Sequence, residues 1–300
     1  MNIYYAIAQH ELLNARRERL PQILLVIFLV MTAVSCFIGW ATNHTVTNVY
    51  NEAVHQGLTT AANPFTGVTP LYYARNTVIY IVLIGALLAI ILGVQSVVRD
   101  RKARVSDLLL SRPLPTWMLL AAKLTGVALW VLTVLIVSAF INWVSISLIN
   151  KHLLLLSDSL RILGFYLVAW LFLLGFCALG MLGGIYSRRE TSALLTPIVI
   201  WTAITFVLPQ LGTAEHPVSL LNPVPAQIVS QGFFFSINQT VFGPLSLAEH
   251  FKAAGSIILH DSEAHGSLIN QLGILALFTT VCICLLLLTA RQRMRSDIYE

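Results

Sequence analysis

The stretch NTVIYIVLIGALLAIILGVQSVV, residues 76–98, decides the fold class of this chain. It contains no charged residue, and as a single helix it is long enough to cross the roughly 30 Å hydrocarbon core of a membrane. It is followed at once by RDRKARVSDLLLSRPLPT, residues 99–116, which is rich in Arg and Lys. The abrupt change from apolar to charged sequence predicts a membrane-spanning helix that ends near residue 98.

The composition places the rest of the chain in a membrane as well. Of its 300 residues, 57% are hydrophobic and 10% are charged, and the mean hydropathy is +0.80. Soluble domains carry about 25% charged residues, so these values exclude both a soluble protein and a disordered one. Five further stretches have spanning length, at residues 21–40, 117–142, 162–186, 191–208 and 268–290. We therefore predict an all-α polytopic membrane protein with six transmembrane helices, forming one domain over residues 1–300.

The positions of Lys and Arg predict how the chain is oriented. Cations near the ends of spans stay on the cytoplasmic side of a membrane. One set of segments holds 14 of the 18 Lys and Arg residues, and the other set holds only Arg75, Lys151, Arg161 and Lys252. Both termini are thus predicted to be cytoplasmic, and segments 41–75 and 209–267 to be extracytoplasmic loops. Because the net charge of +5 belongs to span ends, it does not predict a nucleic-acid partner.

The sequence lacks the residues that several classes of membrane protein need for their function. Ion-coupled transporters place ionisable side chains at membrane depth. Here the spans hold only Lys123, which is close enough to the cytoplasmic end to extend to the surface. No Ser stands two residues after a Gly and no Lys follows a Gly, which excludes a G-x-S-x-G nucleophile and a phosphate-binding loop. No polar constellation at depth suits an intramembrane enzyme. We predict a non-catalytic chain that draws any energy for transport from another subunit.

The charged segment 99–116 has a pattern of its own. Val105, Leu108 and Leu109 recur at i, i+3 and i+4, which predicts a short helix with an apolar stripe. Pro113 and Pro115 then end that helix before the chain re-enters the membrane. Two interpretations remain open at this point. The segment is either a charged loop lying on lipid headgroups or a docking helix that receives force from a partner.

Two other patterns predict helix placement. Residues 1–20 mix apolar side chains with a group of arginines, which favours an amphipathic helix lying in the cytoplasmic interface before Pro21 turns the chain into the bilayer. Small residues also recur at four-residue spacing in the second and fourth spans. They permit a close approach between helix backbones, so we predict tight packing there. These residues are Gly85, Ala89 and Gly93, and Gly180 and Gly184.

Taken in order, these motifs resemble those of the type-two ABC exporter permeases. Within that family the likeness is greatest to the multicopper-enzyme-maturation group, which includes the permease of the nitrous-oxide-reductase copper-maturation transporter. The resemblance covers essentially the whole chain, although each motif is only moderately specific. It is carried by Ile7-Ala8-x-x-Glu11-Leu12, by Arg17-x-Arg19, by Asp107-Leu108-Leu109-Leu110-Ser111-x-Pro113, by Lys123 and by Leu221-Asn222-Pro223.

The resemblance implies a half-transporter in a prokaryotic inner membrane. Two permease subunits, identical or related, would bind two cytoplasmic ATPase subunits, which would hold the ATP and Mg²⁺; this chain would need no cofactor of its own. Segment 99–116 would be the coupling element seated in a groove of each ATPase. Lys102 and Arg104 depart from the family's usual acidic approach to the Leu-rich part, which implies an ATPase groove of unusually acidic character. The implied coupling residues are Asp100, Arg101, Arg104, Val105, Asp107, Leu108, Leu109 and Arg112.

Other interpretations of the function also remain open. The chain would alternatively be a membrane scaffold that couples a cytoplasmic ATPase to a periplasmic partner without transporting a substrate. Lipid, peptide, sulfur species and metal complexes all remain open as substrates. Near the end of the outer segment, His260, Asp261, Glu263 and His265 are residue types that bind metals, although polar residues ahead of a span are more often a solvated linker.

Overall fold

The computed structural model describes residues 3–58, 70–102, 115–187, 189–213, 232–260 and 266–296. Helices dominate these residues, and no strand occurs among them. Six helical segments are long and apolar enough to cross a membrane. The predicted all-α fold with six spans is therefore confirmed. The six segments are Arg19–His55, Thr77–Asp100, Thr116–Asn150, Leu156–Tyr186, Glu190–Leu211 and Leu268–Thr289.

The helices follow one another along the chain in a simple order. A short helix α1 (Ile3–Ala15) precedes the first span, α2 (Arg19–His55). The second span combines α3 (Thr77–Tyr80), a π-helical turn and α4 (Ala86–Lys102). The third and fourth spans are α6 (Thr116–Asn150) and α7 (Leu156–Tyr186). The fifth combines α8 (Glu190–Thr202), a second π-helical turn and α9 (Leu208–Thr213), and the sixth is α12 (Leu268–Ser296).

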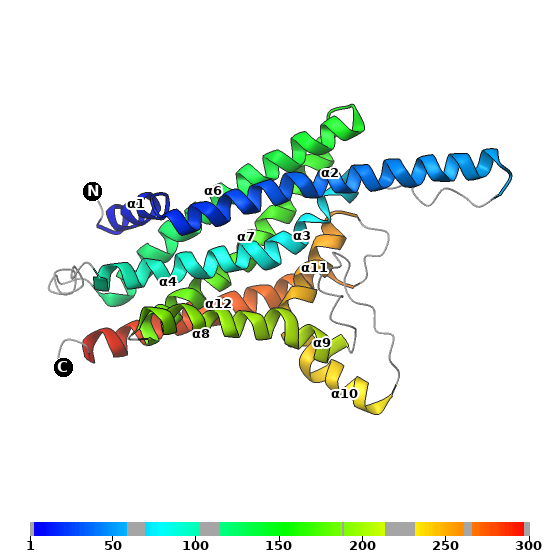
Figure 1. Cartoon of the computed structure of the whole chain (residues 1–300). Helices are drawn as coiled ribbons and strands as arrows, with labels where there is room; N and C mark the ends of the chain where they lie inside the picture. Colours follow the sequence, from blue (N-terminus) through cyan, green and yellow to red (C-terminus); the bar gives the residue numbers. More distant parts are fainter. Residues whose placement is uncertain are drawn as a thin grey trace.

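Helices α2 and α6 are longer than the sequence predicted. Residues 41–55, expected to belong to a loop, instead continue α2, and residues 143–150 continue α6. Neither stretch contains Gly or Pro, so nothing interrupts the backbone hydrogen bonds where the apolar run ends. Each helix stops where the backbone turns left-handed, at Gly57 and at Lys151. The far part of α2 projects beyond the other helices (Figure 1).

Helix α7 forms the centre of the bundle, in contact with α4, α6, α8 and α12. Its closest approach is to α4. A methyl group added at Gly93 would overlap the carbonyl oxygen of Cys177, and one added at Gly180 would overlap that of Ile90. Two glycines facing opposite backbones therefore let α4 and α7 touch main chain to main chain, which confirms the close packing predicted from their spacing.

The described residues between the fifth and sixth spans include two helices, where a loop was predicted. The two helices are α10 (Phe233–Phe242) and α11 (Leu247–Ile258), and α11 packs against α7 and α12. Phe251 lies fully buried against Phe172, with ring centroids 4.7 Å apart. Lys252 is also buried and bonds Glu249 at 2.8 Å. Sequence analysis missed this helix because its charged residues are typical of a soluble surface, whereas pairing allows them to be buried.

A buried polar cluster, which the sequence analysis did not predict, joins four helices. The Asn142 amide donates hydrogen bonds to the Tyr166 hydroxyl at 2.7 Å and to the Thr77 hydroxyl at 3.1 Å. Cys36 donates its thiol hydrogen to the Asn142 oxygen at 2.9 Å. The search for ionisable residues missed the cluster because none of its members carries a charge. It also includes Thr32 and Ser138.

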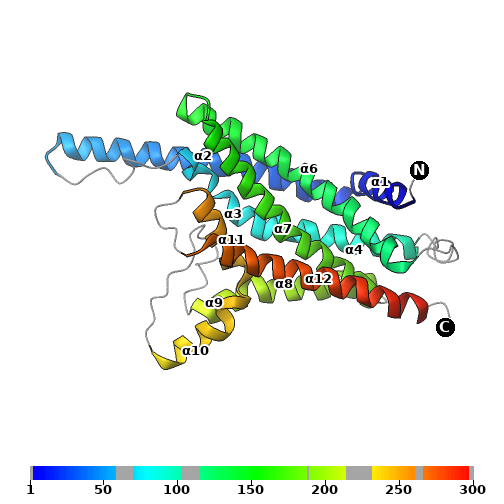
Figure 2. The same ribbon diagram turned by 180° about the vertical axis from the view of Figure 1, so that it is seen from behind.

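Both termini lie at one end of the bundle, which we call the terminal end (Figures 1 and 2). The end of α4 and the start of α6 lie there as well, whereas α9, α10 and α11 lie at the opposite end. The cytoplasmic location of both termini, predicted from the positions of Lys and Arg, stays a prediction.

Candidate functional site

The predicted coupling residues lie at the terminal end or outside the described residues. Asp100 and Arg101 belong to the last turn of α4, which ends at Lys102. Helix α6 begins at Thr116 after Pro115. The two places where segment 99–116 joins the helices, at the end of α4 and at the start of α6, are therefore both described. The remaining predicted coupling residues lie outside the described residues, and they are Arg104, Val105, Asp107, Leu108, Leu109 and Arg112.

An ion pair joins helices α4 and α6 near the two ends of segment 99–116. Lys123 of α6 lies 2.5 Å from the Asp100 carboxylate of α4 and donates a hydrogen bond to the Ser96 carbonyl oxygen at 2.5 Å. Its side chain is only 4% exposed. The Lys123 side chain thus extends toward the end of the second span, as predicted, but its ammonium is buried in an ion pair with Asp100. The acidic partners that neutralise it come from other helices, and the sequence of α6 alone does not reveal them.

Helix α1 contributes a second set of pairs. Glu11 is 3% exposed, binds the Arg99 guanidinium, and lies 3.8 Å from the Lys123 ammonium. Arg99 also bonds Glu18, at the junction of α1 and α2, at 2.8 Å. We call these five residues the charge cluster: Glu11, Glu18, Arg99, Asp100 and Lys123. It ties α1, the start of α2, the end of α4 and the first turns of α6 together.

Close backbone packing holds α1 against α6. A methyl group added at Gly126 would lie 2.5 Å from the Ala8 carbonyl oxygen, so the two helices touch at that point. The Tyr4 hydroxyl lies 2.5 Å from the Thr125 hydroxyl. The predicted N-terminal helix is thus present and is anchored to the third span; its placement in the membrane interface stays a prediction.

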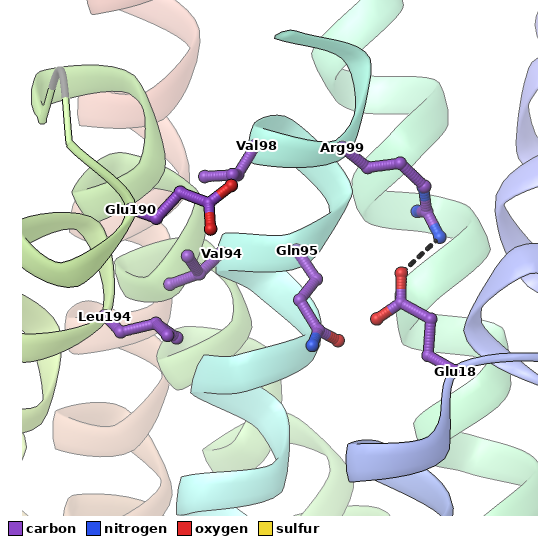
Figure 3. A pocket seen from close by; sticks show the side chains of 7 residues that line it. All are labelled: Glu18, Val94, Gln95, Val98, Arg99, Glu190 and Leu194. Atoms are coloured by element: carbon purple, nitrogen blue, oxygen red, sulfur yellow. Dashed lines mark hydrogen bonds and ion pairs between the residues drawn. The ribbon is translucent and has the colours of Figure 1, made fainter. Parts of the chain in front are cut away.

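A pocket of about 260 Å³ opens beside the charge cluster, between α4 and α8 (Figure 3). Its polar lining consists of Glu18, Gln95, Arg99 and Glu190, and its apolar lining of Val94, Val98 and Leu194. Figure 3 shows Glu190 and Glu18 on opposite sides of Gln95, with the Glu18 carboxylate bound to Arg99. The pocket therefore combines two carboxylates with one guanidinium.

Comparison with protein families shows which family the chain belongs to. The model of the ABC-2 family transporter protein matches residues 5–290, which is nearly the whole sequence. The chain belongs to the ABC-2 transporter family. Comparison with curated proteins gives no significant match. The ABC-2 assignment confirms the resemblance to type-two ABC permeases at the level of the family.

Membership of the ABC-2 family indicates what kind of membrane protein this chain is. Proteins of this family are membrane components of transporters that work with cytoplasmic ATPase subunits. Sequence analysis named Asp100 among the predicted coupling residues but did not predict that it lies in an ion-pair cluster with Glu11, Arg99 and Lys123. One signal was available. Lys123 is a cation set in apolar sequence, and such a residue is expected to pair with an opposite charge when buried.

The predicted metal-binding residues fall mostly outside the described part of the chain. His260 is exposed and has a left-handed backbone, whereas Asp261, Glu263 and His265 lie outside the described residues. Among the described residues, no group of three or more His, Cys, Asp and Glu side chains is placed to hold a metal ion.

Raising the pH is expected to destabilise the protein through Glu11. Burial raises the pKa of Glu11 above its ordinary value of 4.5, although Lys123 and Arg99 oppose the shift. A carboxyl whose pKa is raised by folding contributes stability that is complete below about pH 4.5 and is lost as the pH rises through its folded-state pKa. The Glu11→Gln variant cannot titrate. Its melting temperature, measured from about pH 5 to about pH 8, should fall less than that of the wild type, and parallel curves would contradict the assignment.

Proposed function

We propose that this chain is the permease subunit of an ATP-driven exporter, acting as a dimer in a prokaryotic inner membrane with both termini in the cytoplasm. Segment 99–116 would dock on a separate ATPase subunit that holds ATP and Mg²⁺. The observation that supports this most is the charge cluster, since it connects the residues that enter the segment, Arg99 and Asp100, to three other helices.

The proposed mechanism is mechanical. Closure of the ATPase subunits around ATP would displace segment 99–116. Because Asp100 holds Lys123 of α6 and Arg99 holds Glu11 of α1, the displacement would move the ends of α1, α4 and α6 together. The main-chain contact between α4 and α7 would pass the motion to the centre of the bundle. The chain would contribute no covalent chemistry.

Co-purification tests the docking role. The detergent-solubilised protein, expressed together with the products of its neighbouring genes, is expected to retain an ATPase. Asp107→Lys and Arg104→Glu, which reverse charges in the segment, should each lower the affinity for the ATPase at least about thirtyfold, as expected when a buried interfacial charge pair is lost. Glu52→Lys, on the exposed far part of α2, is the matched control and should retain the ATPase fully.

The outcomes separate the proposal from its alternatives. Retention of an ATPase that segment variants release supports the coupling role. Failure to retain any ATPase contradicts the permease assignment. Cysteines placed along the dimer interface then distinguish transport from scaffolding. Labelling by a water-soluble maleimide along a continuous line indicates a translocation cleft, whereas an interface closed to the reagent indicates a scaffold for a periplasmic partner.

A further inference from the structure

Helix α10 turns an apolar face outward instead of toward the core. Phe234, Ile237 and Val241 recur at i, i+3 and i+7, so they share one side of the helix, and all three are exposed. Ser236 and Gln239 lie on the opposite side. An apolar face of this kind normally packs against other elements, so its exposure indicates apolar surroundings. The exposed apolar side chains are Phe233 (84%), Phe234 (69%), Ile237, Val241 and, in the following turn, Leu245.

Helix α10 lies level with one surface of the membrane. It packs against α9, which completes the fifth span. That span, Glu190–Leu211, has 22 residues, about the length that crosses the roughly 30 Å hydrocarbon core, so α9 ends where hydrocarbon meets headgroups. Both views place α9 and α10 at the end of the bundle opposite the termini (Figures 1 and 2). Helix α10 is therefore within reach of the lipid at that end.

The exposed surface of the fifth span leads directly to α10. Val207 and Leu211, near the end of the span, are large apolar side chains that are exposed. Exposed apolar side chains of a spanning helix lie among the acyl chains of the bilayer. Since Leu211 belongs to α9, lipid that contacts the fifth span reaches the helix on which α10 lies.

The chemistry of α10 favours lipid over a protein partner. No charged residue and no histidine occurs from residue 217 to residue 248. Helix α10 therefore enters apolar surroundings without the cost of burying a charge, and it offers a protein partner no electrostatic complementarity. Phenylalanine on the apolar side of an amphipathic helix is typical of helices that lie in a membrane surface. Without cations, such a helix is attracted by apolar contact alone and not by anionic headgroups.

We propose that α10 is an interfacial helix that inserts its apolar face into the membrane leaflet at the end opposite the termini. Phe233 and Phe234 contact acyl chains, whereas Ser236 and Gln239 face headgroups and water. The turn Gly243–Leu245 joins α10 to α11, which packs against α7 and α12. The inserted helix thus ties the region between the fifth and sixth spans to the lipid surface. This inference does not depend on docking of an ATPase.

Spin labels on the two sides of α10 test the insertion. The full-length protein is reconstituted into phosphatidylcholine vesicles, with the exposed Cys284 replaced by serine so that only an introduced cysteine reacts. Phe234→Cys carries the label on the apolar side and Gln239→Cys on the polar side. Oxygen concentrates in the bilayer, whereas a neutral nickel chelate stays in water. The ratio of oxygen to nickel collisions should be at least about tenfold higher at residue 234 than at residue 239, because hydrocarbon excludes polar solutes.

Val49→Cys is the matched control. Val49 is also an exposed apolar residue, but it lies on the far part of α2, which projects beyond the other helices (Figure 1). Its label should collide with the nickel chelate as often as the label at residue 239. Replacing part of the phosphatidylcholine by phosphatidylglycerol should leave the ratio at residue 234 unchanged, because α10 carries no charge. All three replaced side chains are exposed, so none of these variants is expected to unfold the protein.

Three outcomes would overturn the proposal. A label at residue 234 that meets the nickel chelate as often as the label at residue 49 would place α10 in water. A label at residue 234 that neither reagent reaches would show that protein covers the apolar face, whether from a second copy or from a different partner. A ratio that rises only when phosphatidylglycerol is present would assign the contact to charge instead of apolar insertion.

Discussion

Replacing Gly93 by alanine is expected to lower the stability of the protein by about 3 kcal/mol, the upper part of the range for overpacked cores. The new methyl group would overlap the Cys177 carbonyl oxygen and lie 3.0 Å from the Met181 backbone nitrogen. Both obstacles are main-chain atoms of the central helix α7, so no rotation of a side chain relieves the overlap. The helices α4 and α7 must move apart, and every contact along their interface weakens. Thermal unfolding in one detergent measures the effect.

The control for Gly93→Ala is the same substitution at an open position. A methyl group added at Gly273 of α12 meets no atom within 4 Å. Gly273→Ala is therefore expected to raise stability by up to about 1 kcal/mol, because alanine favours the helix more than glycine does. Gly180→Ala should resemble Gly93→Ala, since its methyl group would overlap the Ile90 carbonyl oxygen. A Gly93→Ala protein that melts like the wild type would show that α4 and α7 do not pack as closely as described.

The glycine contacts illustrate what the sequence predicts and what it omits. The four-residue spacing of Gly85, Ala89 and Gly93 correctly indicated a close helix contact on that face. It did not indicate the partner helix. Nor did it distinguish the two glycines: a methyl group added at Gly93 would overlap main chain, whereas one added at Gly85 would lie 3.4 Å from the side chain of Leu173. Spacing along one helix specifies a face, whereas the partner depends on the arrangement of the whole bundle.

The spans themselves could be predicted because each long apolar run must cross the membrane as a helix. Their ends could not, since α2 continues to His55 through sequence that is polar but contains no helix breaker. Helix α11 was missed for a related reason. Lys252 and Glu249 look like surface residues in sequence, yet Lys252 is buried and forms an ion pair with Glu249. Hydropathy describes residues one at a time, and burial of charge depends on pairs.

The same distinction applies to the candidate site. Asp100 was predicted as a coupling residue from a family motif, and its interaction with Lys123 places it at the attachment point of the segment. Glu11 and Lys123 were recognised only as motif positions. Their contact joins residues 112 positions apart, and no local pattern encodes a contact of that separation. The charge cluster could therefore be found only from the fold.

Lys123→Met is expected to destabilise the protein by about 3 kcal/mol, the lower part of the range for breaking a buried ion pair. Methionine fills a volume similar to that of lysine but leaves Asp100 and Glu11 without their shared cation. The ends of α4 and α6 then lose their direct connection. Lys151→Met is the matched control. Lys151 is exposed at the end of α6, so the same substitution should change stability by less than about 0.5 kcal/mol.

A double variant separates loss of the charge pair from loss of packing. Adding Asp100→Asn to Lys123→Met removes the carboxylate that lost its partner, so the double variant should recover about 2 kcal/mol of stability. If Lys123 served only to fill space, Asp100→Asn would add its own cost and no recovery would occur. The same variants in the reconstituted transporter address coupling. The double variant would fold with the connection between α4 and α6 cut, and ATP hydrolysis that persists while substrate movement fails would assign force transmission to this ion pair.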